Sequence, residues 1–243
     1  SIVINNRLGI QMQGIYQKGM TLIELTVVLL ILIALAGLAI PYVGGTNRMA
    51  LCQATDASMQ AVKTAIMGGG PNMGFYMDML GFYPQKTSNK QDHNDYDLLY
   101  LFKAPDFRSS YNPKTAVGWR GPYLMSGGKA PTGLNDTFKD IYNPSTATTK
   151  VVHTNIKDNT TDSYVMDAWG RPIILQVPYS TTDSEYKLDY ARLVSAGPGS
   201  GIGAGNAEIN TKIHDNSDAD NRGDDRVLYL KTPDPGNNRP CNE

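Results

Sequence analysis

Charged side chains are missing from one long stretch of this 243-residue chain. Nineteen consecutive residues, Leu25 to Val43, carry no charge, and leucine, isoleucine, valine and alanine dominate them. Apolar side chains fall on every face, so the stretch lacks the amphipathic stripe of a soluble core helix. Its length is close to the roughly 20 residues that an α-helix needs to cross the hydrocarbon core of a bilayer. The absence of charge therefore predicts a transmembrane helix over residues 20–43.

Catalytic signatures are missing as well. The three histidines, His93, His153 and His214, stand apart in polar surroundings and lack the HExxH spacing of zinc proteases. The GxGxxA letters at 199–204 are followed by polar and acidic residues, so no phosphate-binding helix N-terminus is expected there. Ser195 and Ser200 lack the G-x-S-x-G pattern of a nucleophile elbow. We therefore predict that the protein is not an enzyme.

Neither sign of charge is in excess. The chain has 22 basic and 23 acidic residues, which gives a formal net charge of -1 at pH 7. Nucleic-acid-binding domains usually carry a basic patch and a basic balance. We therefore do not expect nucleic acid as the main partner.

Cysteine is scarce, because the chain contains only Cys52 and Cys241. An even count allows one disulfide in an exported protein. The two cysteines lie far apart, Cys52 just beyond the apolar stretch and Cys241 near the last residue. An internal bridge, free thiols and an intersubunit bond all remain open.

The residues before the apolar stretch are basic. Residues 1–19 contain Arg7 and Lys18 and no acid, so the positive-inside rule keeps this head in the cytoplasm and sends the rest of the chain outward. A secretory signal peptide has an apolar core of about 7 to 15 residues, followed by a small-residue cleavage site. Here the apolar run is longer and the small residue, Gly19, precedes it, which differs from the secretory pattern.

A family resemblance begins at this junction. The segment KGMTLIELTVVLLILIALAGLAIP resembles the N-terminus of type IV pilins and of the pseudopilins of type II secretion. The resemblance implies that residues 1–19 are a prepilin leader, that a prepilin peptidase cuts after Gly19, and that Met20 is then methylated. Because the chain begins with serine, we expect this leader to be incomplete or trimmed.

Two residues of the apolar helix are expected to guide assembly. Glu24 and Pro41 match, in register, the glutamate and the proline of the family. Cleavage would leave a cationic amine on Met20, and in a low dielectric an unpaired charge is heavily penalised. The resemblance implies that Glu24 of an incoming subunit pairs with this amine of an assembled subunit, which sets the axial register.

The same resemblance implies where the protein acts and what it contacts. Before assembly it would be a single-pass inner-membrane protein with a periplasmic C-terminal domain, and afterwards part of a periplasmic or cell-surface filament. Its partners would be further copies of itself, other pilins or pseudopilins, the prepilin peptidase, the inner-membrane assembly platform and membrane lipid.

An amphipathic helix is predicted to follow the apolar one. In residues 44–67 apolar side chains recur at three- and four-residue spacing, and the glycines and proline at 68–71 stop the helix. The expected fold class is α+β: a long N-terminal α-helix, transmembrane in its first half, packed on a small antiparallel β-sheet with long loops. The globular part spans residues 68–243. Its best strand candidates are 171–179, 186–196 and 226–231.

Further segments narrow the resemblance to the major-pseudopilin branch. These are GWRGPYL at 118–124, DAWGRP at 167–172, and YARLVSAGPGSG at 190–201 followed by RGDDRVLYL at 222–230. They occur in the same order as the family's segments. The two tryptophans, Trp119 and Trp169, are interpreted as large core residues.

An acidic run at 214–225 is a candidate calcium loop. Calcium takes six to eight oxygen ligands, and closely spaced aspartates on a loop with a glycine can supply them. The spacing does not fit an EF-hand, because Arg222 and Tyr229 fall where ligands are needed. In major pseudopilins a loop between these segments binds calcium. The resemblance extends this to Asp215, Asp218, Asp220, Asp224 and Asp225, with a solvated acidic loop as the alternative.

The sequence thus predicts a structural subunit of a type IV pilus-like filament. It is most similar to a pseudopilin of a type II secretion system, which would serve protein secretion through polymerisation of its N-terminal helix. One alternative is a type IV pilin or minor pilin of a surface filament that serves adhesion, motility or DNA uptake. The other is a membrane-anchored periplasmic domain that never polymerises.

Overall fold

The computed structural model describes most of the chain between Met20 and Gly236. The described residues are 20–69, 72–88, 96–129, 139–141, 150–152, 162–180, 185–197, 209, 222, 224–234 and 236. The chain divides into two compact units, Ser1–Gly44 and Gly45–Glu243. The predicted leader at 1–19 and the predicted division of the long helix after residue 43 stay predictions.

Helix α1 runs from Leu22 to Met67 and has 46 residues. At its start the backbone N–H of Glu24 donates to Oγ1 of Thr21 at 3.4 Å, so Thr21 serves as the N-cap. At its end Gly68 has a φ of 87°, the left-handed conformation with which glycine commonly ends helices. The glycine-rich stop predicted after Met67 is therefore confirmed.

The membrane-spanning first half that we expected over residues 20–43 is wrong. A span needs about 20 consecutive apolar helical residues, and among the residues described here no helix is both long and apolar enough to cross a membrane. The fold class is corrected accordingly to a mixture of helix and small antiparallel sheets. The predicted single-pass inner-membrane localisation with a periplasmic C-terminal domain is wrong for the same reason.

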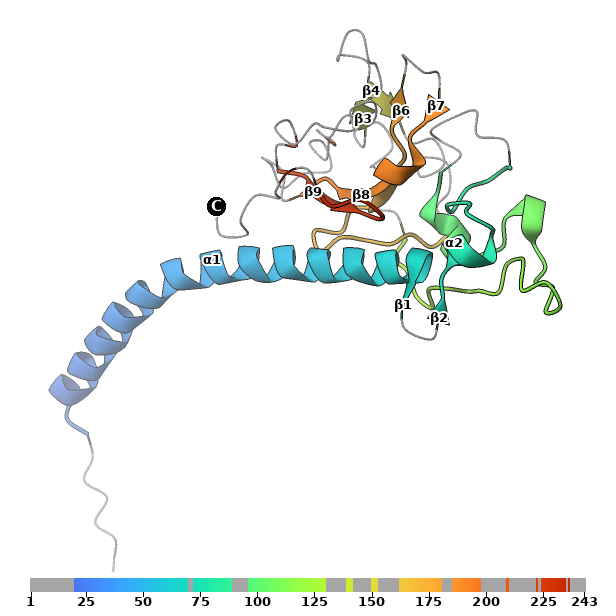
Figure 1. Ribbon diagram of the computed structural model, residues 1–243. Coiled ribbons are helices and arrows are strands. Elements are labelled where there is room, and N and C mark those ends of the chain that lie inside the picture. The colour runs from blue at the N-terminus through green and yellow to red at the C-terminus, as the bar shows by residue number, and fades with distance from the viewer. Residues whose placement is uncertain are drawn as a thin grey trace, which may run out of the picture. The chain divides into compact units, whose positions relative to one another are not determined.

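The central sheet has three antiparallel strands in the order β5-β8-β9. They are β5 (Ile174–Gln176), β8 (Arg192–Ser195) and β9 (Arg226–Tyr229), and each lies within one of the predicted strand segments. Leu175 pairs with Leu193, and Leu193 pairs in turn with Leu228. Figure 1 shows β8 and β9 beside the second half of α1.

Three short hairpins and several single helical turns complete the described part of the second unit. The hairpins are β1 (Gly68–Gly69) with β2 (Asn72–Met73), β3 (Lys139–Ile141) with β4 (Lys150–Val152), and β6 (Tyr179–Ser180) with β7 (Glu185–Tyr186). The helical turns are α2 (Phe75–Asp78) and the 3-10 turns η2 (Leu98–Leu101), η3 (Asp106–Arg108) and η5 (Leu188–Tyr190).

The core of the second unit forms on one stripe of α1. Cys52, Thr55, Met59, Val62 and Ile66 follow one another at alternating spacings of three and four residues, and each is at most 4% exposed. This spacing places them on one helix face. Of these, Met59, Val62 and Ile66 belong to one apolar cluster with the inward-facing leucines of the central sheet.

The opposite face of the central sheet is covered as well. Ile174, Val194 and Val227 alternate with the α1-facing residues, as strand geometry requires, and form a second buried cluster. Ile209, which is fully buried, belongs to this cluster. The central sheet is therefore a middle layer with apolar residues packed on both faces.

Candidate functional site

The leading candidate for a functional surface is the apolar segment Met20–Leu35 in the first unit. Every residue in this range is exposed. The exposed fraction of its large apolar residues runs from 44% at Val28 to 83% at Leu22. Contiguous apolar surface of this kind on a protein marks an interaction site. The segment is therefore suited to being covered by other apolar surfaces.

Glu24 is the one charged residue in this segment. It lies in the first turn of α1, where the partial positive charge of the helix N-terminus favours an acid. Thr21 and Glu24 also have the spacing of a capping box, although the structure records only the bond from the Glu24 N–H to the Thr21 hydroxyl. The Glu24 carboxylate makes no ion pair with the described residues, so it is available to a cation from another chain.

The predicted processing site lies at the edge of the described chain. Gly19 is outside the described residues, whereas Met20 precedes the helix and is 60% exposed. The backbone of Pro41 is helical within α1, and its side chain lies outside the described part. Cleavage and the role of Pro41 stay predictions.

Only two of the five candidate calcium ligands are among the residues that the structure describes. Asp215, Asp218 and Asp220 lie outside the described residues, and Asp224 and Asp225 follow one another just before β9. Within the described chain, no group of three or more histidine, cysteine or acidic side chains could hold a metal ion. The calcium loop therefore stays a prediction.

One predicted disulfide partner can be placed. Cys52 is buried on α1 and is disulfide-bonded, whereas Cys241 lies outside the described residues. The specific pairing of Cys52 with Cys241 stays a prediction.

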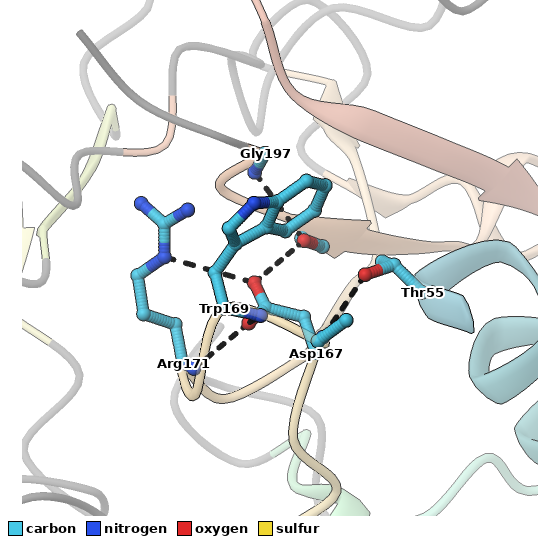
Figure 2. Close-up of polar contacts among 7 residues, drawn as sticks. Thr55, Asp167, Trp169, Arg171 and Gly197 are labelled. Atoms are coloured by element: carbon cyan, nitrogen blue, oxygen red, sulfur yellow. Dashed lines mark hydrogen bonds and ion pairs between the residues drawn. The ribbon is translucent and has the colours of Figure 1, made fainter. Parts of the chain in front are cut away.

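The DAWGRP segment forms a tight turn around the buried carboxylate of Asp167. Its Oδ1 accepts from the backbone N–H groups of Trp169 at 2.9 Å and Arg171 at 2.8 Å, and its Oδ2 accepts from the Ser195 hydroxyl at 2.8 Å. The Ser195 oxygen also accepts from the Gly197 N–H at 3.3 Å. Figure 2 shows this network, which joins the turn to the end of β8.

Burial governs the protonation of Asp167. Desolvation raises its pKa above the ordinary value, and the N–H groups of Arg171 and Trp169, the Arg171 charge and the Ser195 hydroxyl oppose that shift without cancelling it. A second bond ties this turn to α1, because the N–H of Ala168 donates to the Thr55 hydroxyl at 3.0 Å. The turn is thus bonded to the end of β8 through Ser195 and to α1 through Thr55.

Two further polar contacts attach α1 to β9. Arg226 donates from Nε to Oδ1 of Asp56 at 2.9 Å and forms a second, parallel bond from Nη2 to Oδ2. Lys63 donates to the carbonyl of Tyr229 at 2.7 Å. A bidentate arginine–carboxylate pair fixes geometry as well as charge, so α1 is held in one register against the sheet.

The GWRGPYL segment is also structural in this unit. Arg120 donates from Nε and Nη2 to the two oxygens of the fully buried Asp78, at 3.0 and 2.6 Å, and the Tyr123 hydroxyl donates to Oδ2 at 2.7 Å. Desolvation raises the pKa of Tyr123. The Trp119 indole donates to the carbonyl of Tyr100 at 3.1 Å. The motif therefore satisfies a buried acid.

Comparison with known proteins adds nothing to these observations. No family model, curated protein or solved structure matches the chain.

Sequence reasoning missed the partners of the Asp167 network. The DAWGRP segment was recognised as a motif, but Thr55 and Ser195 lie 113 and 28 residues from their partners. The one local signal was Thr55 itself, a polar residue on the otherwise apolar stripe of α1. A polar residue on a core-facing stripe usually finds a buried partner.

Proposed function

We propose that this protein is a structural subunit of a type IV pilus-like filament, most similar to a pseudopilin of type II secretion. The observation that supports this proposal is the exposed apolar segment Met20–Leu35. Covering a leucine or isoleucine side chain completely is worth about 1.5–3 kcal/mol. Stacking copies of the chain through this segment would therefore provide a large driving force for assembly.

Cleavage after Gly19 prepares the subunit for assembly in this proposal. The new amino group on Met20 is cationic, and Glu24 of the next copy supplies the matching anion. Between apolar helices such a pair is strongly favoured over either charge alone. The pair sets the axial register, and the apolar side chains provide the affinity.

The test compares Glu24→Val with the unchanged protein. The variant keeps the apolar character of the helix and loses the anion, so we expect cleavage to proceed and ordered filaments to be lost. Electron microscopy and sedimentation of the cleaved chain measure the outcome. Glu185→Val is the matched control, since Glu185 is an exposed acid in the second unit. Normal filaments from Glu24→Val would refute the register role.

A further inference from the structure

Cys52, which is 4% exposed on α1, takes part in a disulfide bond. The sequence has one other cysteine, Cys241, which lies outside the described residues. Within a single chain Cys241 is therefore the only possible partner of Cys52. Such a bond joins an early turn of α1 in the second unit to the C-terminal end of the chain.

The loop closed by this bond contains almost all of the second unit, Gly45–Glu243. A cross-link that closes a long loop lowers the entropy of the unfolded chain and thereby favours the folded one. The last described residues before Cys241 are anchored as well. Arg222 donates from Nη1 to Oδ2 of Asp234 at 2.9 Å, and the Gly236 N–H donates to Oδ1 of Asp234 at 3.0 Å. The bond thus connects α1 to a C-terminal segment whose described part is fixed to the unit.

Apolar packing holds α1 from Met59 onward. Met59, Val62 and Ile66 belong to the main apolar cluster. Among the described residues, neither apolar cluster includes a residue of α1 that precedes Met59, and Ala54 is exposed. Residues 48–57 of α1 therefore depend on attachments other than the apolar core.

The polar contacts of residues 48–57 are modest in energy. Thr55 accepts a hydrogen bond from the Ala168 N–H at 3.0 Å. Asp56 pairs with Arg226, but the Asp56 side chain is 40% exposed. An ion pair that is open to solvent fixes geometry more than it adds stability. The covalent bond at Cys52 is therefore the strongest attachment of these turns.

We propose that the disulfide between Cys52 and Cys241 is a redox-sensitive clasp on α1. With the bond intact, residues 48–57 stay packed on the second unit. Once the bond is reduced, these turns open, while residues 59–67 and the central sheet keep their packing. The clasp belongs to the single chain, so it does not depend on filament assembly.

A dithiol such as dithiothreitol supplies the reaction that opens the clasp. Its thiolate attacks one cysteine sulfur, the S–S bond breaks through a mixed disulfide, and the second thiol of the reagent releases the other sulfur. The two cysteine sulfurs gain two electrons and two protons in total, and the reagent becomes a cyclic disulfide. Oxidation of the two thiols by a disulfide reagent reverses the change.

The test is hydrogen–deuterium exchange of the full, unassembled chain before and after dithiothreitol, resolved to single amides. We expect the amides of residues 48–57 to exchange about tenfold faster after reduction, because local opening sets their rates. The amides of residues 62–66 and of β8 should change by less than about threefold. The control is the double variant Cys52→Ala and Cys241→Ala, which should exchange fast at 48–57 with and without the reagent.

The intact mass tests the bond itself. Reduction should add two hydrogen atoms, and the unreduced protein should run as a monomer in a denaturing gel. Two free thiols before reduction, or a disulfide-linked dimer, would refute the clasp. Unchanged exchange at 48–57 would refute it as well. Equal acceleration in β8 would show that the bond is needed for the whole fold and is not a local clasp.

Thermal unfolding gives an independent measurement. The oxidised protein should melt about 10 °C above the double alanine variant, as is typical of a cross-link in a domain of this size. Dithiothreitol should lower the Tm of the unchanged protein to that of the variant and leave the variant unaffected. Equal Tm values for the oxidised protein and the variant would contradict the proposal.

Discussion

At the scale of single residues, buried polar groups in the second unit are matched to particular partners. Asp78 is satisfied by Arg120 and Tyr123, and Asp167 by backbone N–H groups and Ser195. Breaking such a buried set leaves an uncompensated charge and is strongly destabilising. The polar residues of the two tryptophan-containing motifs therefore belong to the folding of the unit.

Asp167 gives a pH-dependent prediction. Burial raises its pKa in the folded state above the unfolded value, so folding takes up a proton between the two pKa values. Its contribution to stability is complete below the unfolded pKa and is lost as the pH rises through the folded pKa. Compared with Asp167→Asn, which does not titrate, the unchanged protein should lose free energy of unfolding as the pH rises.

Urea unfolding of both proteins between pH values of about 3 and 7 measures this difference. The Asn side chain can still accept from the N–H groups of Trp169 and Arg171, so the turn should be retained. A stability difference that is constant, or that grows in favour of the unchanged protein as the pH rises, would contradict the assignment.

At the scale of elements, the second half of α1 depends on its buried stripe. Met59 is 1% exposed and belongs to the main apolar cluster. Met59→Ala should lower the free energy of unfolding by about 2–5 kcal/mol, through lost transfer energy and the cavity left behind. Gln60→Ala, on the exposed face of the same helix, should change it by at most about 0.5 kcal/mol.

Urea denaturation of the two variants side by side checks this prediction. Equal effects at positions 59 and 60 would show that the stripe does not carry the packing of α1 against the sheet.

Sequence patterns predicted the elements with local signals. The end of α1 followed from consecutive glycines and a proline, and the three central strands from β-branched and aromatic segments between turn residues. The contacts that attach these elements could not be predicted in this way. The bonds of Thr55, Asp56 and Lys63 join α1 to residues more than 100 positions away, and no local pattern encodes such partners.

At the scale of the whole molecule, the membrane span was predicted from composition and is wrong. An uncharged run of leucine, isoleucine and valine is equally apolar whether lipid or other protein is to cover it, because hydropathy measures only the transfer out of water. The described structure adds that Met20–Leu35 is exposed along its length. We propose that further copies of the chain bury this segment.

The central claim is that assembly buries Met20–Leu35, and hydroxyl-radical footprinting with mass spectrometry tests it most directly. The cleaved protein is oxidised once as dispersed subunits in mild detergent and once as the sedimented assembly. Met125, which is 88% exposed in the second unit, serves as the internal reference. We predict that oxidation of the 20–35 segment falls about tenfold relative to Met125 on assembly. An unchanged ratio in sedimented material, or a protein that stays dispersed once detergent is removed, would contradict the account.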